Sequence, residues 1–369
     1  TRRMKALLLN ILVWISSLGL SQSLDIYHFD VGQGSSTLFL IKNAQKKVVE
    51  SILLDGGTGY GGEYVLSYLK QELKLDTLNR IIASHYDGDH IGGLITLMNA
   101  NFPIKQVMDR GPGSKNTALF TMYTNLANQR QRITLKPGDI ITSYAENNHT
   151  YLIQCIAVNR KVWDPSTNSE VQTGINSDDE NDQSIVVLIQ AQIGTKKFRY
   201  VNGGDIGGIK TTLQKQVEIG PNKTDLEKFN CRCANIESPL IQYNNNFDVF
   251  TANHHGSNCS SNNDWVSLAK ATVVVISSGK NGMYKHPKQS VINRFENNQS
   301  IQKIFLTYPK NEYLRWSKYN KLVVNKESTR TIKTGTKKTR PAGFPVLITV
   351  PDPANTNGYK VNTYSYGFK

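Results

Sequence analysis

One short segment of the sequence holds an unusual density of metal-binding side chains. It reads Ser84-His85-Tyr86-Asp87-Gly88-Asp89-His90-Ile91-Gly92-Gly93-Leu94. Two imidazoles and two carboxylates within six residues suit borderline or hard divalent ions such as Zn²⁺ or Mn²⁺. An exposed polar loop would explain one or two acids, but not this density of ligands after an apolar strand. The segment therefore predicts a metal site, with His85 and Asp87 directed toward one ion and Asp89 and His90 toward a second.

Three further polar groups follow apolar, strand-like segments in the same way. They are Asp55-Gly56-Gly57 after residues 48–54, Asn202-Gly203-Gly204-Asp205 after residues 198–201, and Asn253-His254-His255-Gly256-Ser257 after residues 248–252. Ligand sites in layered α/β proteins gather at the carboxyl ends of strands. We therefore expect Asp205 to bridge two ions and one histidine of the 254–255 pair to complete the second site.

The apolar periodicity predicts an α/β protein in which strands and helices alternate. Strands are expected at residues 24–29, 36–41, 48–54, 80–84, 185–192, 198–201, 248–252, 272–277 and 302–307. Helices are expected at residues 65–73, 118–131 and 265–269, and a further helix is expected to start at Pro287. Two polar segments, near residues 159–183 and 209–246, interrupt the pattern and are predicted to be insertions.

The composition excludes several classes of protein. The 369 residues are 38% hydrophobic and 9% aromatic, which is enough for a large core and excludes a wholly disordered chain. The mean hydropathy is −0.40, and beyond the N-terminus no apolar run approaches about 20 residues, which excludes a polytopic membrane protein. The 43 basic and 29 acidic residues give a net charge of +14, which favours anionic partners such as nucleic acid or a phosphate-bearing surface.

The N-terminal residues have the order of a secretory signal. Three basic residues within the first five positions precede the mostly apolar residues 6–20, and small residues follow at Ser21 and Ser23. This order predicts a signal peptide at residues 1–23, a secreted or periplasmic protein, and no transmembrane domain in the mature chain. An uncleaved anchor and a buried first helix are the alternatives.

The cysteines are compatible with disulfides but not with a cysteine metal site. They are Cys155, Cys231, Cys233 and Cys259. An even number in an exported chain permits two disulfides, and free, partly buried thiols are the alternative. Cys231 and Cys233 are too close in the sequence to bridge each other easily, so any disulfide is expected to pair each of them elsewhere.

Six motifs, taken in order, carry a family resemblance. They are Phe29-Asp30-Val31-Gly32-Gln33-Gly34, Leu53-Leu54-Asp55-Gly56-Gly57, Ser84-His85 through Gly92-Gly93, Gly204-Asp205-Ile206, His254-His255-Gly256-Ser257, and Ile276-Ser277-Ser278-Gly279-Lys280-Asn281 to Tyr284-Lys285-His286-Pro287. This set resembles the metallo-β-lactamase superfamily, and within it the hydrolase domain of the ComEC/Rec2 competence proteins and their stand-alone secreted relatives. The resemblance runs from about residue 24 to 308. It implies a four-layer αββα sandwich over residues 24–369, with the two insertions.

The resemblance also implies a role for each residue of the expected site. The ligands would be His85 and Asp87 for the first ion, Asp89, His90 and His255 for the second, and Asp205 as the bridge between two ions of Zn²⁺ or Mn²⁺. Asp55 would brace the ligand loop from behind, which such sites need for orientation. The catalytic residues would be Asp89, His254 and His286, and the candidate substrate contacts are Ser257, Lys280 and Tyr284.

The sequence departs from the family pattern at two places. Many members have His-x-His-x-Asp-His, whereas Asp87 stands at the second position here, as in the competence branch. A further histidine usually precedes the strand that leads to the bridging aspartate, but residues 180–184 contain none. Asn181 or Asp182 would have to replace it, or the first ion would be weakly held. The oxygen-rich first site favours Mn²⁺ more than an all-histidine site would.

These features predict an exported, metal-dependent hydrolase that uses a metal-activated hydroxide. A phosphodiesterase or nuclease is the preferred reading, because the motifs match the competence branch and the net charge predicts salt-sensitive affinity for DNA. The alternatives are a hydrolase of small phosphoesters such as phosphorylcholine esters, a lactone or β-lactam hydrolase, and a metal-stabilised nucleic-acid-binding module without turnover.

Overall fold

The computed structural model describes residues 22–209, 211–220, 223–280, 283–309, 319–335 and 338–369. The segment expected to be a signal peptide lies outside these residues except for Gln22 and Ser23, and Ser23 opens the first strand. Within the described part of the chain, no helix is both long and apolar enough to cross a membrane.

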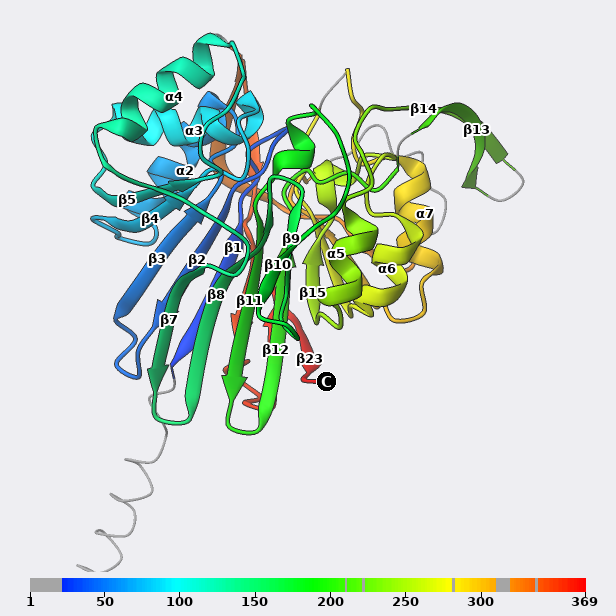
Figure 1. The fold of residues 1–369 in the computed structure, drawn as a ribbon. Helices are drawn as coiled ribbons and strands as arrows, with labels where there is room; N and C mark the ends of the chain where they lie inside the picture. The colour runs from blue at the N-terminus through cyan, green and yellow to red at the C-terminus, as the bar shows by residue number, and fades with distance from the viewer. Residues whose placement is uncertain (1–21, 210, 221–222, 281–282, 310–318, 336–337) are drawn as a thin grey trace, which may run out of the picture.

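Two large sheets form the centre of the molecule (Figure 1). The first has nine strands in the order β23-β22-β21-β1-β2-β3-β4-β5-β6. These are β1 (Ser23–His28), β2 (Thr37–Lys42), β3 (Val48–Leu54), β4 (Leu78–Ile82), β5 (Ile104–Asp109), β6 (Gln131–Thr134), β21 (Val346–Val350), β22 (Gly358–Val361) and β23 (Tyr364–Gly367). Strands β3 to β6 pair in parallel, so their carboxyl ends share one edge of the sheet.

The second sheet has ten strands. Nine follow the order β10-β9-β8-β11-β12-β15-β16-β17-β18, and β7 pairs with β8. These are β7 (Ile140–Glu146), β8 (His149–Val158), β9 (Lys161–Asp164), β10 (Ser169–Gln172), β11 (Val186–Ile193), β12 (Lys196–Asn202), β15 (Val249–Thr251), β16 (Val273–Ile276), β17 (Lys303–Leu306) and β18 (Leu322–Val323). Strands β12, β15, β16, β17 and β18 are parallel, so their carboxyl ends also lie together.

Helices cover the outer face of each sheet (Figure 1). The helices on the first sheet are α2 (Gly59–Gln71), α3 (Gly88–Asn99) and α4 (Ala118–Asn128), and those on the second are α5 (Glu237–Tyr243), α6 (Asn263–Ala269) and α7 (Gln289–Asn297). One apolar core lies between the sheets and one lies beneath each helical layer. The predicted four-layer αββα architecture is therefore confirmed.

Apolar residues on the two faces of a strand contribute to two different cores. In β1 and the residue after it, Leu24 and Ile26 belong to the core between the sheets, whereas Tyr27 and Phe29 belong to the core beneath α2 and α3. Successive side chains of a strand point to opposite faces of the sheet. Both faces are apolar because both are covered.

Several predicted helix boundaries are wrong. The helix expected at residues 65–73 is Gly59–Gln71, and the helix expected at residues 265–269 begins at Asn263. The helix expected at residues 118–131 ends at Asn128, and Gln131 opens β6, which pairs in parallel with β5. The helix expected from Pro287 begins at Gln289. Lys288 is extended (φ −78°, ψ 148°), and its N–H donates to the carbonyl of Gly256 (2.8 Å).

Each expected insertion contains regular structure. Residues 159–183 form β9, β10 and a short 3₁₀ helix, η1 (Asn181–Gln183). Residues 209–246 contain a hairpin of β13 (Thr211–Gly220) and β14 (Lys223–Cys231), followed by α5. A second hairpin, β19 (Glu327–Gly335) with β20 (Lys338–Gly343), lies in the basic C-terminal part of the chain. Cys231 is bonded to Cys259, and Cys155 and Cys233 are free and buried, so one of the two permitted disulfides forms.

A buried histidine in β1 predicts a specific loss of stability in acid. The Nδ1 of His28 lies 3.3 Å from the hydroxyl of Thr37, and burial lowers the pKa of His28 from 6.5 to about 3. Below pH 6.5 the unfolded chain binds a proton that the folded chain does not. This contribution to stability is therefore complete above pH 6.5 and is lost as the pH falls toward 3.

A His28→Gln variant should escape this loss, because glutamine does not titrate. Between about pH 7.5 and about pH 5 the parent chain should lose about 2 kcal/mol more unfolding free energy than the variant. Urea unfolding at both pH values measures the difference. Equal losses in the two proteins would contradict the assignment.

Candidate metal centre

The candidate ligands lie in four loops, each of which follows the carboxyl end of a strand. Asp55 comes directly after β3, and the segment from His85 to His90 follows β4 and enters α3. Asp205 follows β12, and His255 lies in the 3₁₀ turn η2 (Asn253–Gly256) after β15. Strands β3 and β4 are parallel, as are β12 and β15, so parallel pairing places the loops of each sheet at one edge.

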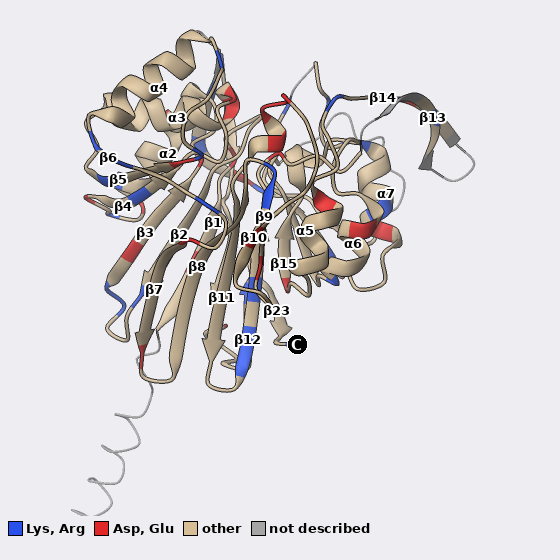
Figure 2. Cartoon of the chain, viewed as in Figure 1, with Lys and Arg blue, Asp and Glu red and all other residues tan. Residues whose placement is uncertain are grey.

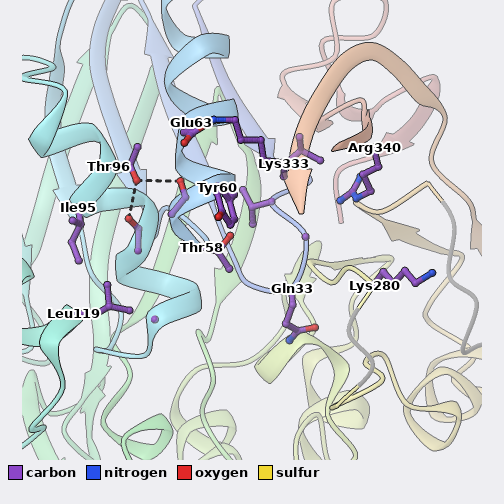
Figure 3. Close-up of a pocket in the computed structure, with 16 residues that line it drawn as sticks. Gln33, Thr58, Tyr60, Glu63, Ile95, Thr96, Leu119, Lys280, Lys333 and Arg340 are labelled. Carbon is purple, nitrogen blue, oxygen red and sulfur yellow. Dashed lines mark hydrogen bonds and ion pairs between the residues drawn. The ribbon is translucent and has the colours of Figure 1, made fainter. Parts of the chain in front are cut away.

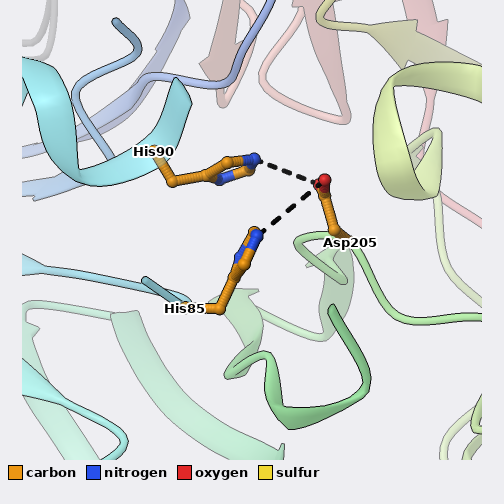
Figure 4. Close-up of side chains that lie close together, drawn as sticks. All are labelled: His85, His90 and Asp205. Carbon is orange, nitrogen blue, oxygen red and sulfur yellow. Dashed lines mark ion pairs between the residues drawn. The ribbon is translucent and has the colours of Figure 1, made fainter. Parts of the chain in front are cut away.

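The first ligand group consists of His85, His90 and Asp205. One ligand atom from each side chain lies within 4.8 Å of the others, and all three residues are buried. The Nε2 atoms of His85 and His90 lie 4.0 Å and 3.3 Å from the Asp205 carboxylate. Figure 4 shows both imidazoles pointing at this carboxylate, His90 from α3 and His85 from the preceding loop.

The second ligand group consists of Asp89, His90 and His255. The Nε2 of His255 lies 3.4 Å from the Asp89 carboxylate and 3.2 Å from that of Asp205. Asp205 thus contacts both groups, at the position expected for a bridging ligand. His90 also takes part in both, although the spacing assigned it to the second ion alone. The reason is that α3 begins at Gly88, so Asp89 and His90 project from a helical turn and not from an extended loop.

Asp87 lies at the edge of the cluster. It is the N-cap of α3, and its side chain makes no capping hydrogen bond. Its carboxylate lies 3.7 Å from Nε2 of His85 and forms an ion pair with Lys115, which comes from the loop between β5 and α4. Sequence analysis missed Lys115, because no motif links this loop to the ligand segment.

The backbone of the site adopts conformations that side chains other than glycine rarely take. Asp55, His254 and His255 have φ angles of 58°, 51° and 57°. Such left-handed residues cost free energy and persist where the surrounding structure holds them. At this site they direct one carboxylate and two imidazoles toward a common region.

Asp55 fixes the orientation of the ligands from behind. Its Oδ1 accepts the backbone N–H of Ser84 (2.8 Å), and its Oδ2 lies 2.7 Å from the Ser84 hydroxyl and 2.8 Å from Nδ1 of His90. The carbonyl of Ser277 accepts from Nδ1 of His255 in the same manner (3.0 Å). With each Nδ1–H engaged outside the cluster, the Nε2 lone pair of each ring points into it.

Asp55→Ala is therefore expected to weaken divalent metal binding by about 10- to 100-fold. The ring of His90 would lose the partner that sets its tautomer and orientation. Calorimetric titration with Zn²⁺ and Mn²⁺ measures the change, and Asp76→Ala, an exposed site before β4, serves as the matched control. Unchanged affinity in the Asp55 variant would show that the ligand loop holds its geometry without this brace.

The electrostatics of the cluster favour a bound positive charge. Burial alone would raise the pKa of Asp205, but His255, His90 and His254 hold it well below its usual value. Burial opposes protonation of His255, yet the Asp205 and Asp89 carboxylates raise its pKa to about 9. Burial, reinforced by His90, lowers the pKa of His85 to about 4. The carboxylates thus stabilise cationic partners, while His85 stays neutral as a ligand must.

These residues fit a divalent metal site. Among the described residues, Nε2 of His85 is buried without a hydrogen-bond partner. The Nε2 atoms of His90 and His255 lie 3.2 Å apart, which two lone pairs would not do without positive charge between them. The residues that would hold metal are His85, Asp89, His90, Asp205 and His255. Divalent ions bound there would supply a hydroxide nucleophile near neutral pH and polarise an ester oxygen.

A cavity of about 530 Å³ opens onto the two ligand groups. Eight of the residues expected at the site line it, namely the expected ligands Asp87, Asp89, Asp205 and His255 together with His254, Ser257, Tyr284 and His286. The Nε2 of His254 lies 3.8 Å from the Asp205 carboxylate, and the ring centroids of His254 and His286 are 5.7 Å apart.

Lys280 lines a different cavity, of about 720 Å³, that shares Gln33 with the first. Figure 3 shows Lys280 and Arg340 on one side of this cavity and apolar side chains on the other. Lys333 at its rim pairs with Glu63 (2.7 Å). The expected contact of Lys280 with a substrate at the metal cavity is therefore not supported by its position.

The two residues considered as substitutes for the absent histidine take different positions. Asp182 is fully buried, accepts from the Ser177 hydroxyl and from the N–H of Ala234 (2.7 Å), and belongs to neither ligand group. Asn181 lines the metal cavity, and its amide nitrogen lies 3.8 Å from the sulfur of Cys233. Of the two, only Asn181 borders the site.

Comparisons with known proteins find a superfamily match over the ligand segment. Residues 31–114 match the model of the Metallo-beta-lactamase superfamily. Recombination protein 2 of Haemophilus influenzae is 26% identical over 278 residues, which cover 73% of this chain and 26% of that protein. The chain thus spans about a quarter of the length of this curated relative. The superfamily match and the αββα architecture confirm the resemblance predicted from the motifs.

Two solved structures are similar to the chain at low identity. The metallo-beta-lactamase fold protein YhfI from Bacillus subtilis is 12% identical, with a TM-score of 0.38, over 79% of this chain and 98% of that one. A diphosphatase from the PhnP family is 9% identical, with a TM-score of 0.37, over 89% of this chain and 98% of that one.

Proposed function

We propose that this protein is an exported, metal-dependent phosphodiesterase that hydrolyses nucleic acid with two divalent ions, Zn²⁺ or Mn²⁺. The observation that carries the proposal is the convergence of both ligand groups on one cavity. That cavity is also lined by the basic side chains of Lys228, Arg232 and Lys288. Acidic and imidazole ligands suit metal ions, whereas lysine and arginine beside them suit the anionic groups of a phosphodiester.

The proposal assigns separate tasks to the side chains around the cavity. Burial lowers the pKa of His254, so its ring stays neutral and can donate an N–H to a phosphoryl oxygen. His286 packs edge-on against His254, at 64° between the ring planes, and orients it. Asp89, whose side chain is 28% exposed, is the ligand that meets incoming substrate.

Two observations support nucleic acid as the substrate, namely the net charge of the chain and its similarity to one relative. The net charge of +14 favours polyanions and predicts binding that weakens with salt. The curated relative is a recombination protein, and recombination acts on nucleic acid. Because this chain spans only about a quarter of that protein, the substrate itself is part of the proposal.

A substrate screen of the purified protein tests the proposal. The panel contains single- and double-stranded oligonucleotides, bis-p-nitrophenyl phosphate, a p-nitrophenyl ester of phosphorylcholine, a lactone and a chromogenic β-lactam. Each is assayed with Zn²⁺, with Mn²⁺ and with a chelator. We expect metal-dependent release of nucleotides that the chelator abolishes.

The other outcomes distinguish the alternative functions. Turnover of the small phosphoesters alone would indicate a phosphorylcholine-esterase-like enzyme, and turnover of the lactone or β-lactam alone would indicate that branch of the superfamily. Binding of oligonucleotide without turnover at saturating Mn²⁺ would indicate a metal-stabilised binding module.

A further inference from the structure

The hairpin of the second insertion reaches the metal cavity with one face of one strand. Figure 1 shows β13 and β14 extending from the body on the side of α7, with the end of β14 returning toward the body. Lys228 and Asn230 in β14, and Arg232 just after it, line the metal cavity, whereas the residues between them do not. This alternation is that of a strand, whose successive side chains point to opposite faces.

The other face of the same strand is fastened to the loop that follows the metal ligand His255. Glu227 accepts from the side-chain amide of Asn258 (2.8 Å) and from the N–H of Ser290 in α7 (3.1 Å). Phe229 is buried, and Cys231 is bonded to Cys259, four residues after His255. The strand is thus attached by a carboxylate, an apolar contact and a covalent bond, so Lys228 and Arg232 are held at a set place beside the metal ligands.

The side chains on the cavity face of the strand are not buried against the body. Lys228, Asn230 and Arg232 are all exposed, although each lines the cavity. Long cations held at the mouth of a hydrolytic cavity suit the successive phosphates of a polymer better than a single small ester.

The cavity also presents an aromatic surface. Tyr284 is 52% exposed, lines the same cavity, and stacks on His286 with 9° between the ring planes and 5.9 Å between the centroids. Bases of single-stranded nucleic acid stack on such rings without sequence preference, whereas paired bases are not free to do so. A base-free polyanion gains nothing from Tyr284.

We infer that the β13–β14 hairpin and Tyr284 form a binding cleft for single-stranded nucleic acid, in which Lys228 and Arg232 hold backbone phosphates and Tyr284 stacks a base beside the metal centre. Any hydrolysis of the bound strand rests on the proposed function. The binding itself is inferred from the cleft alone. Its test therefore measures binding without turnover.

The test uses the metal-loaded protein and a fluorescent oligothymidylate with phosphorothioate linkages, which resist hydrolysis. In anisotropy titrations, Lys228→Ala/Arg232→Ala should weaken binding by at least about tenfold. It should also reduce the slope of log Kd against log salt by about 1.4, since each phosphate contact on a single strand contributes about 0.7.

The matched control is Lys196→Ala/Lys197→Ala, which removes the same charge at the opposite end of β12 from Asp205. Figure 2 shows Lys or Arg colour at the lower end of β12, away from the helices around the site. The control should change the affinity by less than about twofold, because long-range charge alone is screened by salt.

A third variant tests the aromatic part of the cleft. Tyr284→Leu should weaken binding of the oligothymidylate by roughly tenfold and leave binding of an abasic strand of equal length unchanged. Equal effects of the hairpin variant and the control, equal effects of Tyr284→Leu on both strands, or no binding by the parent protein would each overturn the inference. Metal-dependent release of nucleotides from an unmodified oligonucleotide by the parent protein, measured in parallel, shows separately whether the proposed function holds.

Discussion

An Asp205→Asn variant is expected to lose about a thousandfold in hydrolytic rate while remaining folded. Among the described residues, Asp205 is the one carboxylate that approaches His85, His90 and His255 at once, with separations of 4.0, 3.3 and 3.2 Å. Asparagine keeps the size of the side chain but removes its charge and one acceptor oxygen. The imidazoles then lack the anion that draws positive charge into the cluster, so both the affinity for divalent ions and the activation of the nucleophile should fall.

Two measurements separate this effect from a loss of structure. The bound metal per chain, determined by elemental analysis after gel filtration, should decrease together with turnover, whereas the cooperative thermal transition should persist. Asp264→Asn, an exposed site in the first turn of α6, removes the same charge outside the cluster and should retain the parental rate within about twofold.

A variant that loses metal but keeps its rate would show that hydrolysis does not depend on this cluster. A variant that keeps both would remove Asp205 from the site. Either result would leave the hydrolase proposal without its central ligand, whatever substrate the parent protein cleaves.

The ligands that were predicted from the sequence all lie just after the end of a strand, so the strand itself determines where they are placed. His85, Asp89 and His90 lie within a few residues of the end of β4, and Asp205 and His255 follow β12 and β15 closely. Once parallel strands are recognised, their carboxyl ends must share an edge, so the five side chains must lie near one another. The apolar periodicity located nine strands of the two sheets but not β5 to β10, β18 or β21 to β23, and the layered arrangement itself was predicted from the family resemblance.

Contacts made by irregular segments depend on tertiary packing, and the sequence did not predict them. Lys115 reaches Asp87 from a loop without a strand or motif to place it. His90 belongs to both ligand groups because it projects from the first turn of α3. The polar sequence around Gly88 did not predict that the helix begins there. Strand β21 lies near the C-terminus but pairs with β1, which lies near the N-terminus. This pairing, and not a local sequence pattern, determines the place of β21 in the sheet. In each case the missing information is a partner distant in sequence.

Glu237→Ala is expected to cost about 4 kcal/mol of unfolding free energy, because this residue of the second insertion anchors the loop that carries His255. The carboxyl group is fully buried, and its oxygens accept from the side-chain amide of Asn253 (2.7 Å), the N–H of Ser261 and the N–H of Asn262 (2.7 Å). Alanine would leave three buried donors without acceptors, at roughly 1–3 kcal/mol each before relaxation. Glu170→Ala, an exposed site paired with Lys161 in the first insertion, should cost less than about 0.5 kcal/mol.

The loss of unfolding free energy in Glu237→Ala should also depend on pH. Burial of the carboxyl group determines whether this loss is larger at low or at high pH. Burial raises the pKa of Glu237 from 4.5 to about 7, against the hydrogen bonds from Asn253, Asn262 and Ser261 that favour ionisation. Between these values the folded chain holds a proton that the unfolded chain has released, so this contribution to stability is lost as the pH rises. Urea unfolding should therefore show a cost about 2 kcal/mol larger at about pH 5.5 than at about pH 8.5. A cost that stays constant would mean that the three donors outweigh burial and keep the carboxylate ionised. The insertion would then hold the His255 loop through an anion and not through a neutral acid.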